Sequence, residues 1–119
     1  MVHGPKGRHE VIRVLIEGGA DPNKIGEKEW RLTPLHQAAT DKEEDVDNED
    51  VARALLEGGA ELDPVDKHGR TPLNHAAFDG HKKVAKLLLE KGADPNLAGS
   101  IHGDTPLHLA SRGVIQGFN

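Results

Sequence analysis

Apolar side chains recur along this chain with helical spacing, in two alternating kinds of segment. In the first kind, Leu35, Ala38 and Ala39 fall at positions i, i+3 and i+4. In the second kind, Val84 and the pair at 87–88 repeat that spacing with larger side chains. Apolar residues spaced in this way line one face of an amphipathic helix. The pattern therefore predicts a series of short helices that alternate in type.

Each kind of segment occurs three times. The first kind reads TPLHQAA, TPLNHAA and TPLHLAS, starting at residues 33, 71 and 105. The second kind reads VIRVLIEGGADPN, VARALLEGGAELD and VAKLLLEKGADPN, starting at residues 11, 51 and 84. Successive copies are separated by 38 and 34 residues in the first kind and by 40 and 33 in the second. Such self-similarity at a nearly fixed period indicates a repeat protein.

The ends of both helices are marked in the sequence. Thr33 is suited to cap a helix, and Pro34 follows at the first helical position, where its missing N–H is harmless. The glycines at 19, 59 and 92 stand where a helix can end in a left-handed residue. The segments that follow are rich in Asp, Asn, Pro and Gly, which favour turns. We therefore expect helix–turn–helix units joined by turn-rich loops.

A period near 33 residues, two helices in each unit and TPLH followed by alanine together resemble the ankyrin-repeat family. The resemblance covers roughly residues 8–113. It implies an all-α repeat solenoid, an ankyrin helix-turn-helix stack with projecting β-hairpin-like loops. It also implies that the imidazoles of His36 and His108 are structural and bond near the Thr cap and across repeats. In such a stack each repeat contacts only its neighbours.

We interpret residues 1–119 as a single ankyrin-repeat domain. Its expected parts are an N-terminal half repeat (1–20), a repeat with an acidic insertion between its helices (21–60), a further repeat (61–93) and a C-terminal partial repeat (94–119). The insertion lies in residues 41–50, which carry seven acidic residues. We expect residues 48–50 to cap a helix that starts near Val51, in preference to a calcium loop, which would need a glycine and a terminal Glu at other positions.

The two ends of the expected stack are apolar, whereas solenoids normally carry polar caps. The exposed candidates are Val11, Ile12, Val14, Leu15, Ile16, Val114, Ile115 and Phe118. Two interpretations stay open. The chain is a piece of a longer array, or its ends are covered by another copy in a homodimer.

Composition narrows the function classes. The net charge is −5, from 15 basic and 20 acidic residues, which argues against a nucleic-acid-binding role because such proteins present a basic face. Cysteine is absent, so disulfides and thiolate chemistry are excluded. We find neither a membrane-spanning apolar run nor the apolar stretch of a signal peptide. These features predict an intracellular, cytoplasmic protein that contacts neither membrane nor nucleic acid.

The histidines do not form a recognisable metal motif. His9 and Glu10 begin like the zinc motif H-E-x-x-H, but Arg13 stands at the fifth position. We expect four further histidines to lie at the surface: His68, His75, His81 and His102. The sequence thus predicts no metal and no cofactor.

No catalytic constellation is evident either. Ser100, His102 and Asp104 lie close together in one expected loop, but a working triad also needs an ordered hydrogen-bond chain and an oxyanion hole. We therefore expect a chain that is not an enzyme. A small metal-binding or hydrolytic protein remains the weakest alternative.

The resemblance implies that a protein partner meets the tips of the loops and the exposed face of the first helices. The matching positions are Glu29, Trp30, Leu32, Lys67, His68, Arg70, Phe78, Asp79, Ile101, His102, Asp104 and Arg112. Trp30 could instead fold onto its own loop, and Phe78 could pack between repeats. The leading hypothesis is a non-catalytic protein–protein interaction module for an unidentified protein. The alternative is a structural spacer within a longer ankyrin array.

Overall fold

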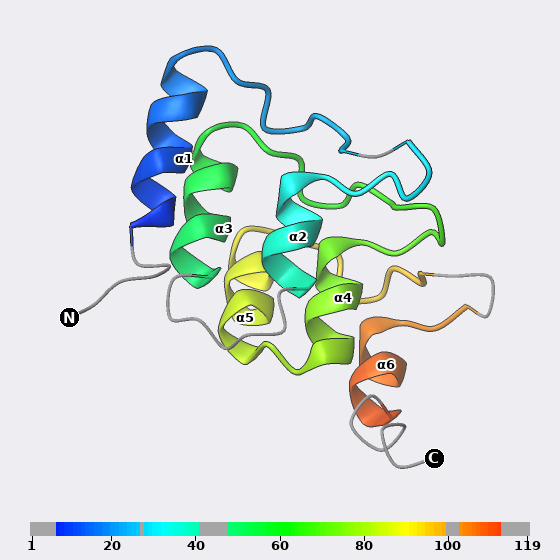
Figure 1. The fold of residues 1–119 in the computed structure, drawn as a ribbon. Helices are drawn as coiled ribbons and strands as arrows, with labels where there is room; N and C mark the ends of the chain where they lie inside the picture. Colours follow the sequence, from blue (N-terminus) through cyan, green and yellow to red (C-terminus); the bar gives the residue numbers. More distant parts are fainter. Residues whose placement is uncertain (1–6, 27, 41–47, 100–102, 113–119) are drawn as a thin grey trace.

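The computed structural model describes residues 7–26, 28–40, 48–99 and 103–112. Within these ranges all regular elements are α-helices (Figure 1). They are α1 (Arg8–Glu17), α2 (Pro34–Thr40), α3 (Asn48–Glu57), α4 (Pro72–Asp79), α5 (Lys82–Glu90) and α6 (Pro106–Arg112). The expected alternation of two helix types is confirmed.

The six helices stack in two rows. The helices that begin with the TPL segments form a first row, in which α2 contacts α4 and α4 contacts α6. The others form a second row, in which α1 contacts α3 and α3 contacts α5 (Figure 1). Contacts of α2 with α3 and of α4 with α5 join the rows. This arrangement is the repeat solenoid that the periodicity predicts, because every helix packs on the same helix type of the adjoining unit.

The core lies between the two rows and is built from the apolar stripes read in the sequence. Leu35 and Leu73 come from the first row, and Val51, Leu55 and Leu88 from the second; all are buried. Buried alanines from both rows complete this core, and such small side chains let helices approach closely. The scarcity of aromatic residues is consistent with this aliphatic core.

The expected helix ends are also confirmed. The Thr71 hydroxyl accepts from the backbone N–H of Asn74 at 3.1 Å, and the Asn74 side chain accepts from the Thr71 N–H at 2.8 Å. This reciprocal pair caps α4. Gly19, Gly59 and Gly92 have φ of 107°, 105° and 106°, a left-handed conformation that glycine adopts without strain.

One helix starts earlier than the sequence indicates. Helix α3 begins at Asn48, so residues 48–50 form its first turn instead of preceding it. Glu49 and Asp50 lie in that turn, where acidic side chains interact favourably with the helix dipole. The rest of the acidic insertion, residues 41–47, lies outside the described part of the chain. None of the described helices is long and apolar enough to cross a membrane.

Candidate partner-binding site

The loop before α4 is shaped by one carboxylate. Asp66 Oδ1 accepts hydrogen bonds from the backbone N–H groups of His68 and Arg70, both at 2.9 Å. The Asp66 N–H donates to the Arg70 carbonyl at 3.0 Å, and the Gly69 N–H donates to the Asp66 carbonyl at 3.0 Å. These bonds close a hairpin-like turn that presents residues 67 and 68 at its tip. This loop, one of those that the sequence predicts, is therefore ordered by local hydrogen bonds.

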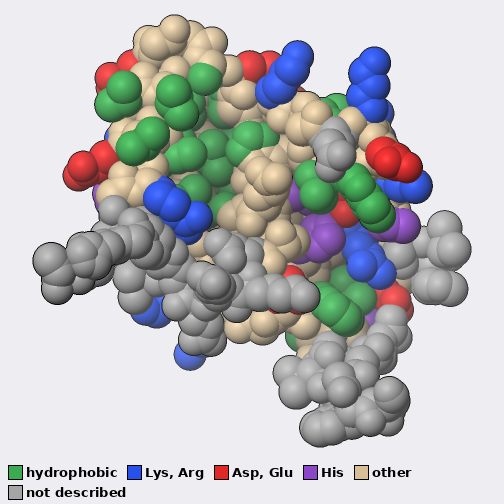
Figure 2. Space-filling view, viewed as in Figure 1, with side chains coloured by type: hydrophobic (Ala, Val, Ile, Leu, Met, Phe, Trp, Pro, Cys, Tyr) green, Lys and Arg blue, Asp and Glu red, His purple; other side chains and the backbone are tan. Residues whose placement is uncertain are grey.

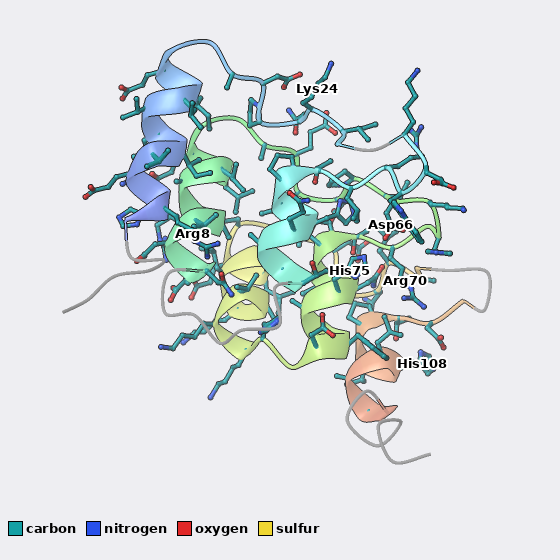
Figure 3. All side chains as sticks on the ribbon, in the orientation of Figure 1. Arg8, Lys24, Asp66, Arg70, His75 and His108 are labelled. Carbon is teal, nitrogen blue, oxygen red and sulfur yellow. The ribbon has the colours of Figure 1, made fainter. Side chains whose placement is uncertain are left out.

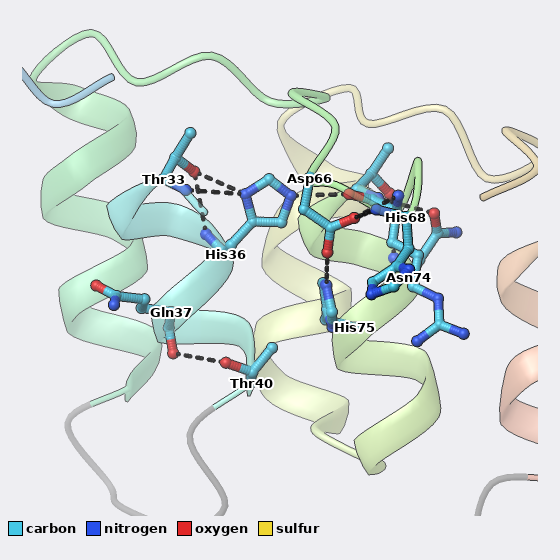
Figure 4. Close-up of polar contacts among 10 residues, drawn as sticks. Thr33, His36, Gln37, Thr40, Asp66, His68, Asn74 and His75 are labelled. Carbon is cyan, nitrogen blue, oxygen red and sulfur yellow. Dashed lines mark hydrogen bonds and ion pairs between the residues drawn. The ribbon is translucent and has the colours of Figure 1, made fainter. Parts of the chain in front are cut away.

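His36 joins this hairpin to the helix of the preceding unit. Its Nδ1 lies 3.1 Å from the Thr33 N–H and 3.0 Å from the Thr33 hydroxyl, and its Nε2 lies 2.8 Å from the Arg70 carbonyl (Figure 4). A backbone N–H can only donate, so Nδ1 is the acceptor and the proton is on Nε2. Burial lowers the pKa of His36, although the bond to the Arg70 carbonyl opposes that effect. The imidazole is therefore neutral and structural.

His75 is largely buried, which corrects the expectation that it lies at the surface. Its Nε2 lies 2.7 Å from Asp66 Oδ2, and its ring meets the His36 ring edge to face at 5.5 Å. Burial raises the pKa of Asp66, but the hydrogen bonds from the Arg70 N–H and from His75 outweigh burial and hold this pKa below its ordinary value. The Asp66–His75 pair thus fastens the hairpin to α4.

His36, Asp66 and His75 bring three potential metal-ligand atoms within 4.8 Å of one another. The hydrogen bonds argue against their use as ligands. A metal on Nε2 of His36 would displace the proton given to the Arg70 carbonyl and force a proton onto Nδ1, where it would oppose the Thr33 N–H. We therefore interpret the cluster as a hydrogen-bond network that orders the loop.

Trp30, in the loop before α2, forms an exposed contact with the hairpin before α4, called the second hairpin below. The Lys67 N–H donates to the Trp30 carbonyl at 2.9 Å, and the Lys67 ammonium lies 5.3 Å from the centroid of the Trp30 ring. The His68 ring is tilted against the same indole at 6.1 Å. Trp30 nevertheless remains 45% exposed. We call Trp30, Lys67 and His68 the tip cluster.

The other predicted partner-binding residues differ in accessibility. Glu29 is exposed, whereas Leu32, Arg70, Phe78 and Asp79 are half-buried. The side chain of Asp104 is buried and 8% exposed. Ile101, His102 and the side chain of Arg112 lie outside the described residues. Figure 3 shows Lys24 on the first loop and Asp66 and Arg70 on the second.

Comparison with known proteins identifies the architecture. A family model described as ankyrin repeats (3 copies) matches residues 1–99. The chain belongs to the ankyrin-repeat family. Ankyrin repeats are generally protein–protein interaction modules and are generally non-catalytic.

The relatives are much longer proteins with varied names. The chain is 32% identical over 109 residues to "E3 ubiquitin-protein ligase KEG" of Arabidopsis thaliana and covers 6% of it. It is 34% identical over 113 residues to "Ankyrin repeat and SOCS box protein 16" of Homo sapiens and covers 23% of it. These matches span 92% and 93% of the chain. The chain thus spans less than a quarter of the length of either relative. The part that each relative shares with the chain is the aligned repeat segment.

Proposed function

We propose that the chain binds a protein partner through the loop tips and the exposed face of the first-row helices. The observation that carries this proposal is the tip cluster. It combines an exposed indole with a cation and a second ring, and tryptophan is prominent among residues that dominate interface energies. The proposed surface also includes the exposed Glu29, next to Trp30 in the chain, and Asp79 at the end of α4.

The surface is preorganised for binding. The tip cluster joins the loop before α2 to the second hairpin, and the second hairpin is fastened to α4 through Asp66 and His75. It is also fastened to α2 through the bond from His36 to the Arg70 carbonyl. A partner would therefore meet groups that are already ordered, which lowers the entropic cost of association.

Affinity capture with matched variants tests the proposal. Wild-type chain, Trp30→Ala and Leu89→Ala would each be immobilised, and retained proteins would be quantified by mass spectrometry. Trp30 and Leu89 are both 45% exposed, but Leu89 lies on α5 in the second row. We expect a partner that wild type and Leu89→Ala retain and Trp30→Ala loses. Binding of that purified partner, measured by calorimetry, should weaken roughly tenfold or more in Trp30→Ala. Equal binding to all three chains would contradict the proposed surface.

A second proposal is self-association through the ends of the stack. It is supported by large apolar side chains at both ends, where Val14 is 66% and Leu107 is 76% exposed. The alternative, that the segment is a spacer in a longer array, is supported by the length of the relatives. In that arrangement adjoining repeats would cover the same two ends.

A further inference from the structure

The exposed residues of α1 occupy positions that are buried in the other second-row helices. In the sequence repeat, Val11, Val14 and Leu15 align with residues 84, 87 and 88 of α5. The α1 residues are 58%, 66% and 54% exposed, whereas Val84, Leu87 and Leu88 are 2%, 1% and 0% exposed. The difference arises because α5 packs on α4, while the described residues supply no first-row helix for the repeat of α1. Helix α1 is half of a repeat.

Helix α6 is the opposite half. Leu107 and Ala110 align with Leu35 and Ala38 of α2, which are 0% and 7% exposed. Leu107 is 76% exposed, and Ala110 is also exposed. Helix α6 packs on α4, but the described residues supply no second-row helix to cover its other side. The two ends therefore display complementary halves of one repeat.

We propose that copies of this chain stack head to tail, with α6 of one copy packing against α1 of the next to complete a repeat. This inference rests on the proposed self-association and specifies its geometry. A groove of about 220 Å³ lies where the incoming helix would sit. Its apolar lining includes Ile12 of α1, Ala38 of α2 and Leu55 of α3. Figure 2 shows hydrophobic side chains gathered over the region between α1 and α2.

The imidazole of His108, at the α6 end of the stack, matches this geometry. His108 Nδ1 lies 3.1 Å from the Thr105 N–H and 2.8 Å from its hydroxyl, as His36 does with Thr33, but His108 is exposed. In the proposed stack its Nε2 would donate to the Leu32 carbonyl of the next copy, as His36 donates to the Arg70 carbonyl. The Leu32 carbonyl accepts from Gly26 N–H, and a carbonyl has a second lone pair for the imidazole.

Charges at the two ends are complementary in the same register. Within the chain, Arg13 of α1 pairs with Glu57 of α3 at 3.3 Å. In the sequence repeat Lys86 of α5 aligns with Arg13, and Glu17 of α1 aligns with Glu57. Both Lys86 and Glu17 are exposed. Head-to-tail stacking would place Lys86 of one copy opposite Glu17 of the next and so reproduce an ion pair already present between repeats.

The first experiment is sedimentation equilibrium of the 119-residue chain over a wide concentration range. A head-to-tail contact leaves one end of each kind uncovered, so association should continue beyond the dimer as concentration rises. A monomer at every concentration would overturn self-association and, with it, this inference. A mass that stops at the dimer would retain self-association but contradict the open head-to-tail geometry.

Two end variants then test the polarity of the contact. Val14→Glu disables the α1 end of the stack, and Leu107→Glu disables the α6 end. Both residues are exposed, so the fold should persist. Each substitution would bury an unpaired carboxylate in the contact, so each variant alone should associate roughly 100-fold or more weakly than wild type. An equimolar mixture should form a one-to-one complex, because one intact end of each kind remains.

Val65→Glu is the matched control, since Val65 is 50% exposed in the second hairpin, away from both ends. It should associate as wild type does, and circular dichroism should show the same helix content in all three variants. Undiminished self-association of Leu107→Glu or of Val14→Glu alone would indicate a symmetric contact and overturn the inference. A mixture that stays monomeric would overturn it as well.

Discussion

The first turns of α2 and α4 are capped in the same way, but by different side chains. At the start of α2, His36 accepts from the Thr33 N–H; at the start of α4, the amide oxygen of Asn74 accepts from the Thr71 N–H. Both side chains then donate to a loop of the following unit. His36 reaches the Arg70 carbonyl at 2.8 Å, and Asn74 reaches the Leu97 carbonyl at 3.3 Å.

The loops that receive these bonds differ at one equivalent position. Asp66 and Gly99 correspond, because the backbone N–H of each donates to the carbonyl of the residue before the next Thr, Arg70 or Asp104. Asp66 is buried and binds His75 through its carboxylate, whereas a side chain at Gly99 would overlap the Asn74 amide. The comparison indicates that the capping side chain limits which residue the next loop can carry at this position.

The largest expected effect comes from removing the imidazole. His36→Ala leaves the Thr33 N–H and the Arg70 carbonyl without this partner and opens a cavity at a side chain that is 0% exposed. We expect a loss of roughly 3 kcal/mol in the free energy of unfolding, measured by urea denaturation. Gln37→Ala, an exposed neighbour on α2, should change it by less than about 0.5 kcal/mol. Similar losses in the two variants would contradict the assigned role of His36.

The second largest effect is expected at Gly99, where the loop after α5 lies close to the Asn74 side chain of α4. A Cβ added to Gly99 would overlap the side-chain amide of Asn74 and lie 3.1 Å from the Arg70 Cα. Gly99→Ala should therefore cost about 2 kcal/mol of unfolding free energy, because the loop must move away and weaken the Asn74 bond. Gly26→Ala is the control, since its nearest neighbour would be the Leu32 carbonyl oxygen at 3.8 Å. If thermal denaturation shows wild-type stability for both variants, then the contact between Gly99 and Asn74 is not tight enough to exclude a side chain.

Much of this fold could be predicted from the sequence because its determinants are local. The Thr cap, the left-handed glycines and the i, i+3, i+4 stripes each act within one helix, so their positions could be read directly. The sequence predicts that α3 starts near Val51, three residues after its actual start at Asn48, because capping residues and first-turn residues have similar composition.

The candidate site was less accessible to sequence reasoning because its contacts cross from one unit to another. The His75 ring packs at 5.5 Å against the ring of His36, which comes from the preceding unit. The contact of Trp30 with Lys67 joins loops from separate repeats. The repeat alignment does offer a signal for such contacts, since it indicates which loops lie side by side, but it does not give side-chain reach.

A third effect concerns pH and follows from the titratable character of His36. In the folded chain its pKa is held below the ordinary 6.5. As pH falls through 6.5, the unfolded chain therefore binds a proton at His36 and the folded chain does not. The free energy of unfolding should therefore decrease as pH drops from about 7.5 to about 5. The carboxylate of Asp66, whose pKa is also lowered, loses its stabilising contribution only below its ordinary 3.8, outside this window.

His36→Asn isolates this contribution, because asparagine can make the Thr33 contacts that Asn74 makes with Thr71 and does not titrate. The variant should be less stable than wild type at neutral pH, and the stability difference between the two should shrink as pH falls. A pH series of chemical denaturation measures that difference. A difference that stays constant across the series would show that His36 is not the source of the pH dependence.

The smallest effect is expected at His108, which repeats the Thr contacts of His36 but is exposed at the end of the stack. In dilute solution His108→Ala should cost only about 0.5–1 kcal/mol, the size of a lost helix cap. At concentrations where copies associate, the cost should rise, because head-to-tail stacking would give His108 the inter-repeat bond that His36 already has. Thermal denaturation of wild type and His108→Ala at low and high protein concentration measures the cost of the substitution in the monomer and in the associated chain. A cost that is independent of concentration, in a chain shown to associate, would mean that the contact leaves His108 uncovered and does not continue the repeat.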